Sequence, residues 1–506
     1  MNQTETGLNP MQMEAVEYTE GPLLILAGAG SGKTRVLTHR IASLIRDKGV
    51  NPWNIMAITF TNKAAGEMRE RVDKIVGYGS ERIWVSTFHS SCVRILRRHA
   101  ERLGYANNFA IYDTDDQKSL IKDIMKRLQM DPKLYRDRAI MAAISSAKDE
   151  MIEPDQYRID AGIDWKLQKY AAVYAEYQAE LKKNNAMDFD DLLVQTVKLF
   201  QQFPEVLDYY QEQFRYIMVD EYQDVSEVQD LIFRAVSRDG NNLFFVGDVK
   251  QSIYRFRLAD PTIFLDKYAR FADFRAAAPG APRRILLREN FRSRRAVLAG
   301  ANHVFSNIMS RALGELAYDD AARLRAGAPY PDDGEKPELA VLELPDADDD
   351  APTPEKSALE ADYVARRIRA LIDGGASVWE NGAERPAHYG DVVILLRSAN
   401  SVGPVYRAAL EAQGIPVSAE TSGGFYTSEE VSVLCSLLAV VDNPHQDVPL
   451  IAALRSPLFG LTADDLAAVR TCDREHDFYT AVTLAAETRG DCRDFLDVLA
   501  RYRALS

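Results

Sequence analysis

Near its N-terminus the chain reads Ala27-Gly28-Ala29-Gly30-Ser31-Gly32-Lys33-Thr34. An apolar run at 23–26 precedes this stretch, and a helical pattern over 34–45 follows it. Glycines let backbone N–H groups turn inward around phosphate oxygens, and the N-terminus of the following helix adds its positive dipole end. The Lys33 ammonium can reach β- and γ-phosphates, and the Thr34 hydroxyl can hold Mg²⁺. The stretch therefore predicts a phosphate-binding loop between a strand and a helix, although the strict pattern has Gly where Ala27 stands.

A second apolar run, at 216–219, ends at Asp220 and Glu221. A carboxylate at the end of a strand is well placed to hold Mg²⁺, and an adjacent carboxylate can orient or deprotonate attacking water. The acidic pair alone says little. Together with the glycine-rich loop, in this order, it predicts an enzyme that binds ATP with Mg²⁺ and hydrolyses the nucleotide.

Apolar strand-like runs alternate with helical patterns, which is typical of a parallel α/β sheet covered by helices. Long amphipathic helical patterns interrupt this alternation between about residues 96 and 200, so we expect a helical insertion within one α/β domain. A second α/β region is expected after residue 285, and helices alone after 429. The runs interpreted as strands are 23–26, 55–60, 83–86, 216–219, 243–246, 285–287, 339–344 and 392–396, and the helical patterns include 118–128, 165–181 and 359–372.

The composition excludes several classes of protein. With 506 residues, of which 46% are apolar and 27% charged, the chain is long enough for about three or four domains. Its net charge of −14 argues weakly against nucleic-acid binding, but a local basic channel is compatible with it. The four cysteines form no C-x-x-C pair, which argues against zinc, an iron–sulfur cluster or a disulfide framework. The polar start and the short apolar runs predict a cytoplasmic protein without membrane contact.

The segment 247–257 follows one of the predicted strands. Gln251 stands just past the strand end, where it can sense a γ-phosphate. Tyr254 and Phe256 are interleaved with arginines, which suits stacking on single-stranded bases with backbone contacts alongside. Taken alone, the segment is better explained as an ordinary loop after a strand with a packed aromatic residue.

Three other motifs carry similar chemistry. Arg292, in Asn290-Phe291-Arg292-Ser293, can reach across a cleft as an arginine finger. The segments 59–65 and 86–90 combine aromatic with small polar side chains, which can contact bases and phosphates. Each of these two segments is equally compatible with a helix N-cap.

Taken in order, the motifs resemble those of superfamily-1 DNA helicases of the UvrD/PcrA/Rep group. Leu8-Asn9-Pro10-Met11-Gln12 is similar to the adenine-reading Q motif of that group, and a phosphate loop that begins with Ala is its usual form. Ala186-Met187-Asp188-Phe189-Asp190-Asp191 also resembles the group. From about residue 214 the chain resembles AddA, a helicase–nuclease subunit related to RecB, notably over 246–261 and 442–457.

The resemblance implies a role for each matched residue. ATP is expected to be bound by Gln12 on adenine, by Arg35 and Phe291 packed on the adenine ring, and by the phosphate loop, Ala27, Gly28, Ala29, Gly30, Ser31, Gly32, Lys33 and Thr34. Mg²⁺ is expected at Thr34 and Asp220. Catalysis is expected from Lys33, from Glu221 as the base, and from Gln251 and Arg292 on the γ-phosphate. Single-stranded DNA is expected along Phe60, Thr61, Asn62, His89, Tyr254 and Phe256.

The resemblance also implies two RecA-like P-loop domains with inserted helical subdomains. We expect domain 1A at 1–95 and 201–284, helical domain 1B at 96–200, the first part of domain 2A at 285–430, and the start of helical domain 2B at 431–506. Two family elements, a motif resembling T-x-H-x-x-K-G-L-E and a second finger arginine, have no match after Arg292, and neither has the AddA-type nuclease domain. We therefore expect a C-terminally truncated chain.

The implied function is ATP-dependent 3′→5′ movement on single-stranded DNA in repair or recombination, impaired by the missing motifs. Single- and double-stranded DNA are the implied partners, and the AddA resemblance leaves room for an AddB-like subunit. The alternatives are a motor acting on RNA, a nucleotide-binding scaffold without motor activity and, less well supported, a small-molecule P-loop kinase. Stimulation by DNA against RNA distinguishes the motors, and ATP binding that DNA leaves unchanged indicates the scaffold.

Overall fold

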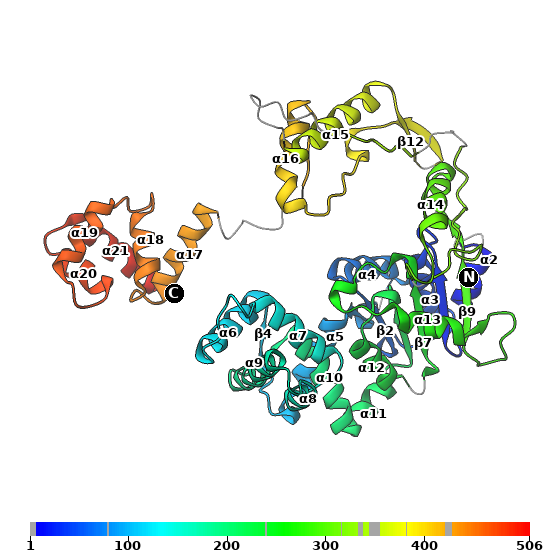
Figure 1. Cartoon of the computed structure of the whole chain (residues 1–506), viewed down its shortest axis with the longest axis horizontal. Helices are drawn as coiled ribbons and strands as arrows, with labels where there is room; N and C mark the ends of the chain where they lie inside the picture. The colour runs from blue at the N-terminus through cyan, green and yellow to red at the C-terminus, as the bar shows by residue number, and fades with distance from the viewer. Residues whose placement is uncertain are drawn as a thin grey trace. The chain divides into compact units, whose positions relative to one another are not determined.

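The computed structural model describes residues 7–77, 80–237, 240–314, 316–331, 337–343, 355–380, 382–419 and 428–505. The chain divides into two units, Met1–Glu338 and Leu339–Ser506 (Figure 1). The four domain boundaries expected from the sequence stay a prediction.

The first unit is built around a parallel sheet of seven strands in the order β3-β2-β6-β7-β1-β9-β8. Apolar runs form its central strands because helices cover both faces, so that every residue of β1, β2 and β7 is buried. Residues 285–287, expected to open the second α/β region, pair instead with β1 in this sheet. The strands are β1 (Leu23–Ala27), β2 (Ile55–Thr59), β3 (Trp84–Thr87), β6 (Tyr216–Val219), β7 (Leu243–Gly247), β8 (Ala272–Asp273) and β9 (Arg283–Leu287).

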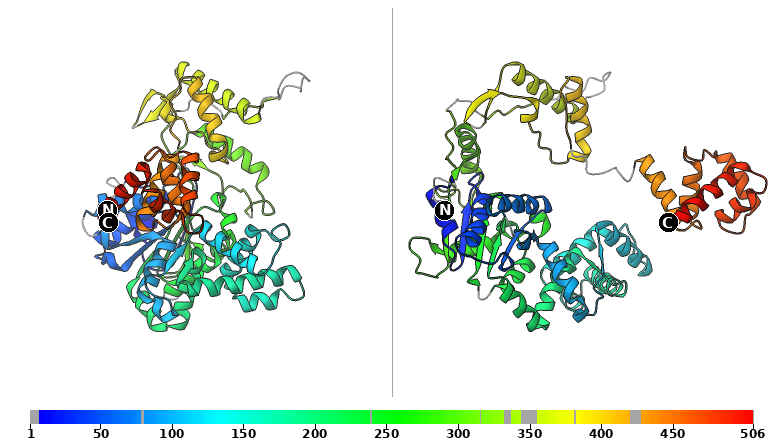
Figure 2. Two further views of the ribbon diagram at one scale, coloured as in Figure 1. Left: turned by 90° about the vertical axis from the view of Figure 1, so that its left-hand side faces the viewer. Right: turned by 180° about the vertical axis from the view of Figure 1, so that it is seen from behind.

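Helices pack on both faces of this sheet (Figure 2). Successive residues of β1 alternate between two cores, because side chains in a strand point to opposite faces. One core contains α2 (Pro10–Glu17), α3 (Lys33–Arg46) and α4 (Asn62–Val76). The other contains α5 (Phe88–His99), α10 (Phe189–Gln202), α11 (Pro204–Gln213), α12 (Glu227–Val236) and α13 (Pro261–Arg270).

The helical block predicted between the third and fourth strands is present. It has its own apolar core, which includes Ile140 and Tyr177, and a short parallel pair of strands at its base. Its elements are β4 (Ala110–Tyr112), α6 (Thr114–Arg127), α7 (Asp137–Asp149), α8 (Pro154–Asp160), α9 (Trp165–Lys183) and β5 (Ala186–Asp188). This group of elements is called the helical insertion below.

Residues 289–331 complete the first unit. They contain β10 (Glu289–Asn290), α14 (Arg295–Ile308) and β11 (Arg325–Ala326), and β10 pairs with β11.

The second unit is mainly helical, with one antiparallel ribbon among its described residues. It contains α15 (Lys356–Asp373), β12 (Ser377–Glu380), β13 (Ala383–Pro386) and α16 (Ala399–Ala412). The helices predicted after residue 429 are present as α17 (Glu429–Asp442), α18 (Asp447–Arg455), α19 (Ala463–Cys472), α20 (Phe478–Ala485) and α21 (Gly490–Leu505).

Two strand predictions in this unit are wrong. Residues 339–343 and 392–396 form no strand, and residue 344 lies outside the described residues. Val393 and Leu395 are 77% and 90% exposed, so this apolar run is not covered on both sides as a central strand would be. An apolar run forms a stable strand only where neighbouring strands pair with it, and no described residue pairs with this one.

Among the described residues, no helix combines the length and the apolarity needed to cross a bilayer.

Candidate nucleotide and DNA site

Most motifs predicted to bind nucleotide or DNA follow a strand of the parallel sheet, whereas the Q motif lies on α2, ahead of β1. The phosphate loop follows β1, the acidic pair follows β6, and Gln251 follows β7. Because the strands are parallel, their carboxyl ends share one edge, which is where open α/β sheets bind ligands. The sheet order β6-β7-β1-β9 places these loops next to one another.

The phosphate loop is shaped as a cradle. Gly30 and Gly32 have φ angles of 68° and 82°, which a residue with a side chain rarely adopts. A Cβ added to Gly30 would lie 2.6 Å from the Asn290 amide nitrogen, and one added to Gly32 would lie 2.8 Å from that of Gln12. The buried Ser31 hydroxyl has no hydrogen-bond partner among the described residues, so it is available to a phosphate oxygen. The loop therefore fits a nucleotide phosphate.

Lys33 opens α3 and lies between two acceptors. Its Nζ is 3.2 Å from Glu221 Oε2 and 3.2 Å from Gln251 Oε1, and its side chain is only 10% exposed. The residues proposed as phosphate-binding lysine, catalytic base and γ-phosphate sensor are thus in direct contact. The ion pair with the Glu221 carboxylate holds the Lys33 ammonium between these two residues.

Asp220 and Thr34 lie together beside Lys33, as a shared Mg²⁺ site requires. The Thr34 hydroxyl lies close enough to the Asp220 carboxyl to oppose the rise in its pKa. Burial, with the charge of Glu221 nearby, raises the pKa of Asp220 to about 7. Among the described residues no cluster of three His, Cys, Asp or Glu could hold a metal ion alone. Mg²⁺ in nucleotide sites needs few protein ligands because phosphates and water supply the rest, so this pair of oxygen ligands fits it.

Glu221 is held in an unusual backbone conformation. Its φ angle is 52°, which is uncommon for a residue other than glycine and clusters at functional sites. Gln223 Nε2 donates to Glu221 Oε2 at 2.7 Å, and the Asp248 backbone N–H donates to Gln223 Oε1 at 2.9 Å. A hydrogen-bonded chain therefore connects Glu221 to the end of β7.

Gln12 lies against the phosphate loop, but its side chain is already engaged. Its Nε2 donates to Ser31 O at 2.8 Å, and its Oε1 accepts from Asn9 N at 2.9 Å as part of a capping box on α2. One amide hydrogen remains for an adenine ring. Arg35 is exposed, and its guanidinium lies close to Gly7. The adenine-reading roles of both side chains stay predictions.

The segment 290–292 closes over the phosphate loop. Asn290 Nδ2 donates to Ala29 O at 2.6 Å, and the Phe291 N–H donates to Gly30 O at 2.9 Å. The Cβ of Arg292 lies 2.9 Å from the place that a Cβ on Gly30 would occupy. Phe291 is 37% exposed, and the Arg292 side chain is also exposed. Both predicted residues are therefore beside the nucleotide cradle.

The residues predicted to contact DNA lie just after β2, β3 and β7. Thr61 caps α4, with its Oγ1 accepting from Ala64 N at 3.1 Å, and Asn62 is the first residue of that helix. The helix N-cap that was the alternative for this segment is thus present at Thr61. Phe60 packs edge-on against Phe88, with ring centroids 6.4 Å apart.

The other predicted aromatic contacts form pairs. Tyr254 and Phe256 have ring centroids 5.9 Å apart, and Phe256 is 77% exposed. His89 lies 5.7 Å from the ring of Phe189, which is 45% exposed. Burial lowers the pKa of His89, so its ring is neutral at neutral pH. Exposed rings near the carboxyl ends of the strands are suited to stack on bases.

Sequence reasoning assigned no role to four residues at this site: Gln223, Asp248, Asn290 and Phe189. Asp248, Asn290 and Phe189 stand inside motifs quoted for other residues, and Gln223 closely follows the acidic pair, but spacing does not show what these side chains contact. Asn290 reaches the phosphate loop because Ala27 pairs with Leu287, and this register is a property of the folded sheet. The one signal in the sequence was a Phe placed among the acidic residues of the 186–191 motif.

Two profiles of one helicase family match this chain. The profile of the UvrD/REP helicase N-terminal domain matches residues 8–272, and that of the UvrD-like helicase C-terminal domain matches 285–489. The chain belongs to the UvrD/REP helicase family. The UvrD-like C-terminal match includes residues 339–489 of the second unit, in which the described residues form no parallel sheet.

Curated relatives agree with this family. The chain is 41% identical to the ATP-dependent DNA helicase PcrA of Bacillus subtilis over 468 residues, which is 92% of the chain and 58% of the relative. It is 40% identical to PcrA of Staphylococcus aureus over 470 residues, 93% of the chain and 58% of the relative, and 39% identical to a Staphylococcus epidermidis PcrA. The chain thus spans less than two thirds of the length of these relatives.

Proposed function

We propose that this chain is the ATP-binding and DNA-translocating part of an ATP-dependent DNA helicase. The observation that supports this proposal most is the contact of Lys33 with both Glu221 and Gln251 at the mouth of a glycine cradle. Thr34 and Asp220 would hold Mg²⁺, which neutralises phosphate charge when bound.

The side chains suggest an order of events. Entry of a triphosphate draws the Lys33 ammonium from Glu221 to phosphate oxygens, because three charged oxygens attract it more strongly than one carboxylate. Glu221 is then free to accept a proton from water, while Gln223 continues to orient its carboxylate through the 2.7 Å hydrogen bond. Lys33 therefore keeps the proposed base occupied until nucleotide binds.

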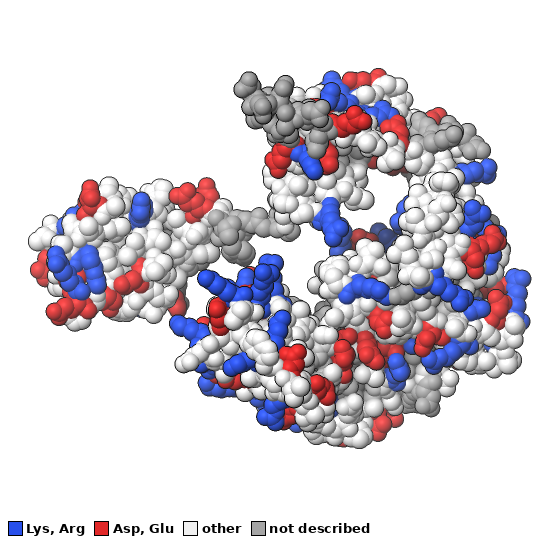
Figure 3. Space-filling view, in the orientation of Figure 1, with Lys and Arg blue, Asp and Glu red and all other residues white. Residues whose placement is uncertain are grey.

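DNA binding is proposed at the exposed rings of Phe256 and Phe189 and at the neighbouring Phe60, His89 and Tyr254. Figure 3 shows numerous Lys and Arg side chains over the helical insertion, although the net charge of the chain is −14. A local positive surface attracts a phosphate backbone regardless of net charge. The exposed cations of the insertion include Lys122, Lys126, Arg127, Lys133, Arg136, Arg138, Lys166 and Lys169.

Several finer features are proposed as well. A cytoplasmic location is proposed because the apolar runs are too short to span a bilayer. The resemblance supports 3′→5′ movement in repair or recombination and the domain plan 1A, 1B, 2A and 2B, with β9 assigned to the sheet of domain 1A. AddA-like character after residue 214 and an AddB-like partner are proposed on the same ground. Because this sequence has no match to the second finger arginine, we expect hydrolysis to be slowed by roughly 10³- to 10⁵-fold and unwinding to be poor.

The test is ATP hydrolysis by the purified chain with and without single-stranded DNA. Lys33→Ala should lower the DNA-stimulated rate by about 10²- to 10³-fold, because a preorganised charge on the transferred phosphate is lost. Lys48→Ala, which removes an exposed lysine just past the same helix, should leave the rate unchanged. ATP binding that DNA does not alter would favour a nucleotide-binding scaffold, and stimulation by RNA but not DNA would favour an RNA motor.

A further inference from the structure

Asp248 is a buried carboxylate that the proposed reaction does not use directly. It is 1% exposed, and Lys250 Nζ lies 2.7 Å from its Oδ1. The Lys250 side chain is itself only 9% exposed. A buried carboxylate is costly unless a cation and hydrogen bonds compensate it, so Lys250 stabilises the ionised form of Asp248.

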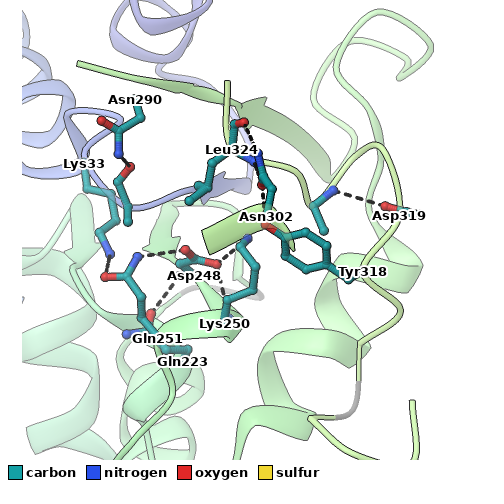
Figure 4. A network of polar contacts seen from close by, with 12 residues as sticks. Lys33, Gln223, Asp248, Lys250, Gln251, Asn290, Asn302, Tyr318, Asp319 and Leu324 are labelled. Carbon is teal, nitrogen blue, oxygen red and sulfur yellow. Dashed lines mark hydrogen bonds and ion pairs between the residues drawn. The ribbon is translucent and has the colours of Figure 1, made fainter. Parts of the chain in front are cut away.

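The second oxygen of Asp248 sets the direction of the Gln251 amide. Gln251 Nε2 donates to Asp248 Oδ2 at 2.7 Å, and Gln251 Oε1 accepts from Lys33 Nζ at 3.2 Å. An ionised carboxylate only accepts hydrogen bonds, so the amide nitrogen must face it. Figure 4 shows Gln251 between Lys33 and Asp248, with Lys250 on the far side of Asp248.

A segment remote in sequence lies near Lys250. Lys250 lines a small cavity together with Gly28 and Leu324. Asn302 fixes this segment, because its Oδ1 accepts from Leu324 N at 3.0 Å and its Nδ2 donates to Leu324 O at 2.9 Å. The Tyr318 hydroxyl donates to the same Asn302 oxygen at 2.7 Å (Figure 4). The Lys250–Asp248 ion pair therefore lies beside a segment that is fixed by its own hydrogen bonds.

We propose that Lys250 is a positioning residue for triphosphate recognition. By holding Asp248 it fixes the Gln251 amide in the orientation that reads the γ-phosphate. This inference rests on the proposed function. Lys250 acts only through Asp248 and Gln251, so its loss affects recognition of the γ-phosphate and leaves recognition of the β-phosphate by the glycine loop unchanged.

The test compares the affinities of fluorescent ADP and fluorescent ATPγS for the full chain. Lys250→Met should weaken ATPγS binding by about tenfold, the value of one hydrogen bond to a charged group, and leave ADP binding unchanged. Lys250→Arg keeps a positive charge beside Asp248 and should retain most of the preference for ATPγS. In a Gln251→Ala background, Lys250→Met should have no further effect, because both variants remove the same contact. Lys74→Met is the control for loss of an exposed lysine.

If Lys250 had only a structural role, Lys250→Met would weaken the binding of both nucleotides equally. That result would overturn the inference. Additive effects of Lys250→Met and Gln251→Ala would also overturn it. A parent chain that binds neither nucleotide would refute the proposed function and this inference with it. The inference alone would be refuted if the parent chain binds both nucleotides, Lys33→Ala abolishes this binding, and Lys250→Met leaves both affinities unchanged.

Discussion

Single charged side chains at the edge of the sheet differ in how well they are compensated. Lys33 is compensated by Glu221 and Gln251, and Lys250 by Asp248. Asp220 makes no such ion pair with a described residue, although the charge of Lys33 acts on it, and Glu221 lies next to it in the chain. The carboxylate proposed to hold Mg²⁺ is therefore the least compensated charge of the site, which suits it to bind a cation and costs stability in its absence.

At this scale, Asp220→Asn should stabilise the chain in a pH-dependent way. The folded chain holds the Asp220 proton until the pKa of about 7, whereas the unfolded chain releases it near the ordinary pKa of 3.8. The contribution of Asp220 to stability therefore falls as pH rises from about 4 to about 7. Because Asn does not titrate, the free energy of unfolding of the variant should exceed that of the parent at pH 8 by at most about 4 kcal/mol. At pH 5 the difference should be smaller.

Thermal unfolding in EDTA at pH 5 and pH 8 measures this difference. Asp155→Asn, at a side chain that is 89% exposed, serves as the control and should shift the midpoint little at either pH. Equal shifts for Asp220→Asn at both pH values would contradict the assigned pKa.

At the scale of elements, a buried charge cluster joins the helical insertion to α10. Lys148 Nζ, on α7, lies 2.7 Å from Asp188 Oδ2 and 2.9 Å from Asp191 Oδ1, and all three side chains are at most 2% exposed. Burial alone lowers the pKa of Lys148, yet the two carboxylates raise it above its ordinary value. Asp188 also caps α10 and accepts from the Tyr177 hydroxyl at 2.9 Å. The 186–191 motif therefore has a structural role that its resemblance did not reveal.

Lys148→Met should destabilise the first unit by about 3–5 kcal/mol, because it leaves two carboxylates buried without their cation. Urea unfolding followed by circular dichroism measures the loss. The matched control is Lys183→Met, whose side chain is 75% exposed and which should cost less than about 0.5 kcal/mol. A loss for Lys148→Met no greater than that of the control would show that the cluster does not hold the insertion.

The strands of the first unit were predictable because their signals are local. The run at 216–219 is apolar and ends in acids, and it forms β6. The run at 392–396 has the same local character and forms no strand. Hydrogen-bond partners from elsewhere in the chain decide between these outcomes, and an apolar run does not encode them.

At the scale of the whole molecule, each contact described for the phosphate loop comes from the first unit. Gln12, Asn290 and Leu324 all lie before residue 339. We therefore expect a chain of residues 1–338 to bind ADP within about threefold of the full chain, because a threefold change is less than the loss of one hydrogen bond. Titration of fluorescent ADP into both proteins measures this. A large loss of affinity in the shorter, folded protein would place an unrecognised nucleotide contact in the second unit.

The local chemistry of the site follows from the residues alone. Phosphate and Mg²⁺ can be bound by glycines that adopt positive φ, by a lysine and a hydroxyl at a helix start, and by an acid after a strand. These properties depend on the conformation and charge of residues that adjoin in the sequence. The tertiary structure decided which distant groups meet. Lys33 contacts Glu221, Asn290 reaches Ala29, and Lys250 pairs with Asp248 near Leu324. These groups meet because β6, β7, β1 and β9 are neighbours in the sheet and pair in a fixed register. Strand order and register arise from the fit of whole elements in the core, so no local segment specifies them.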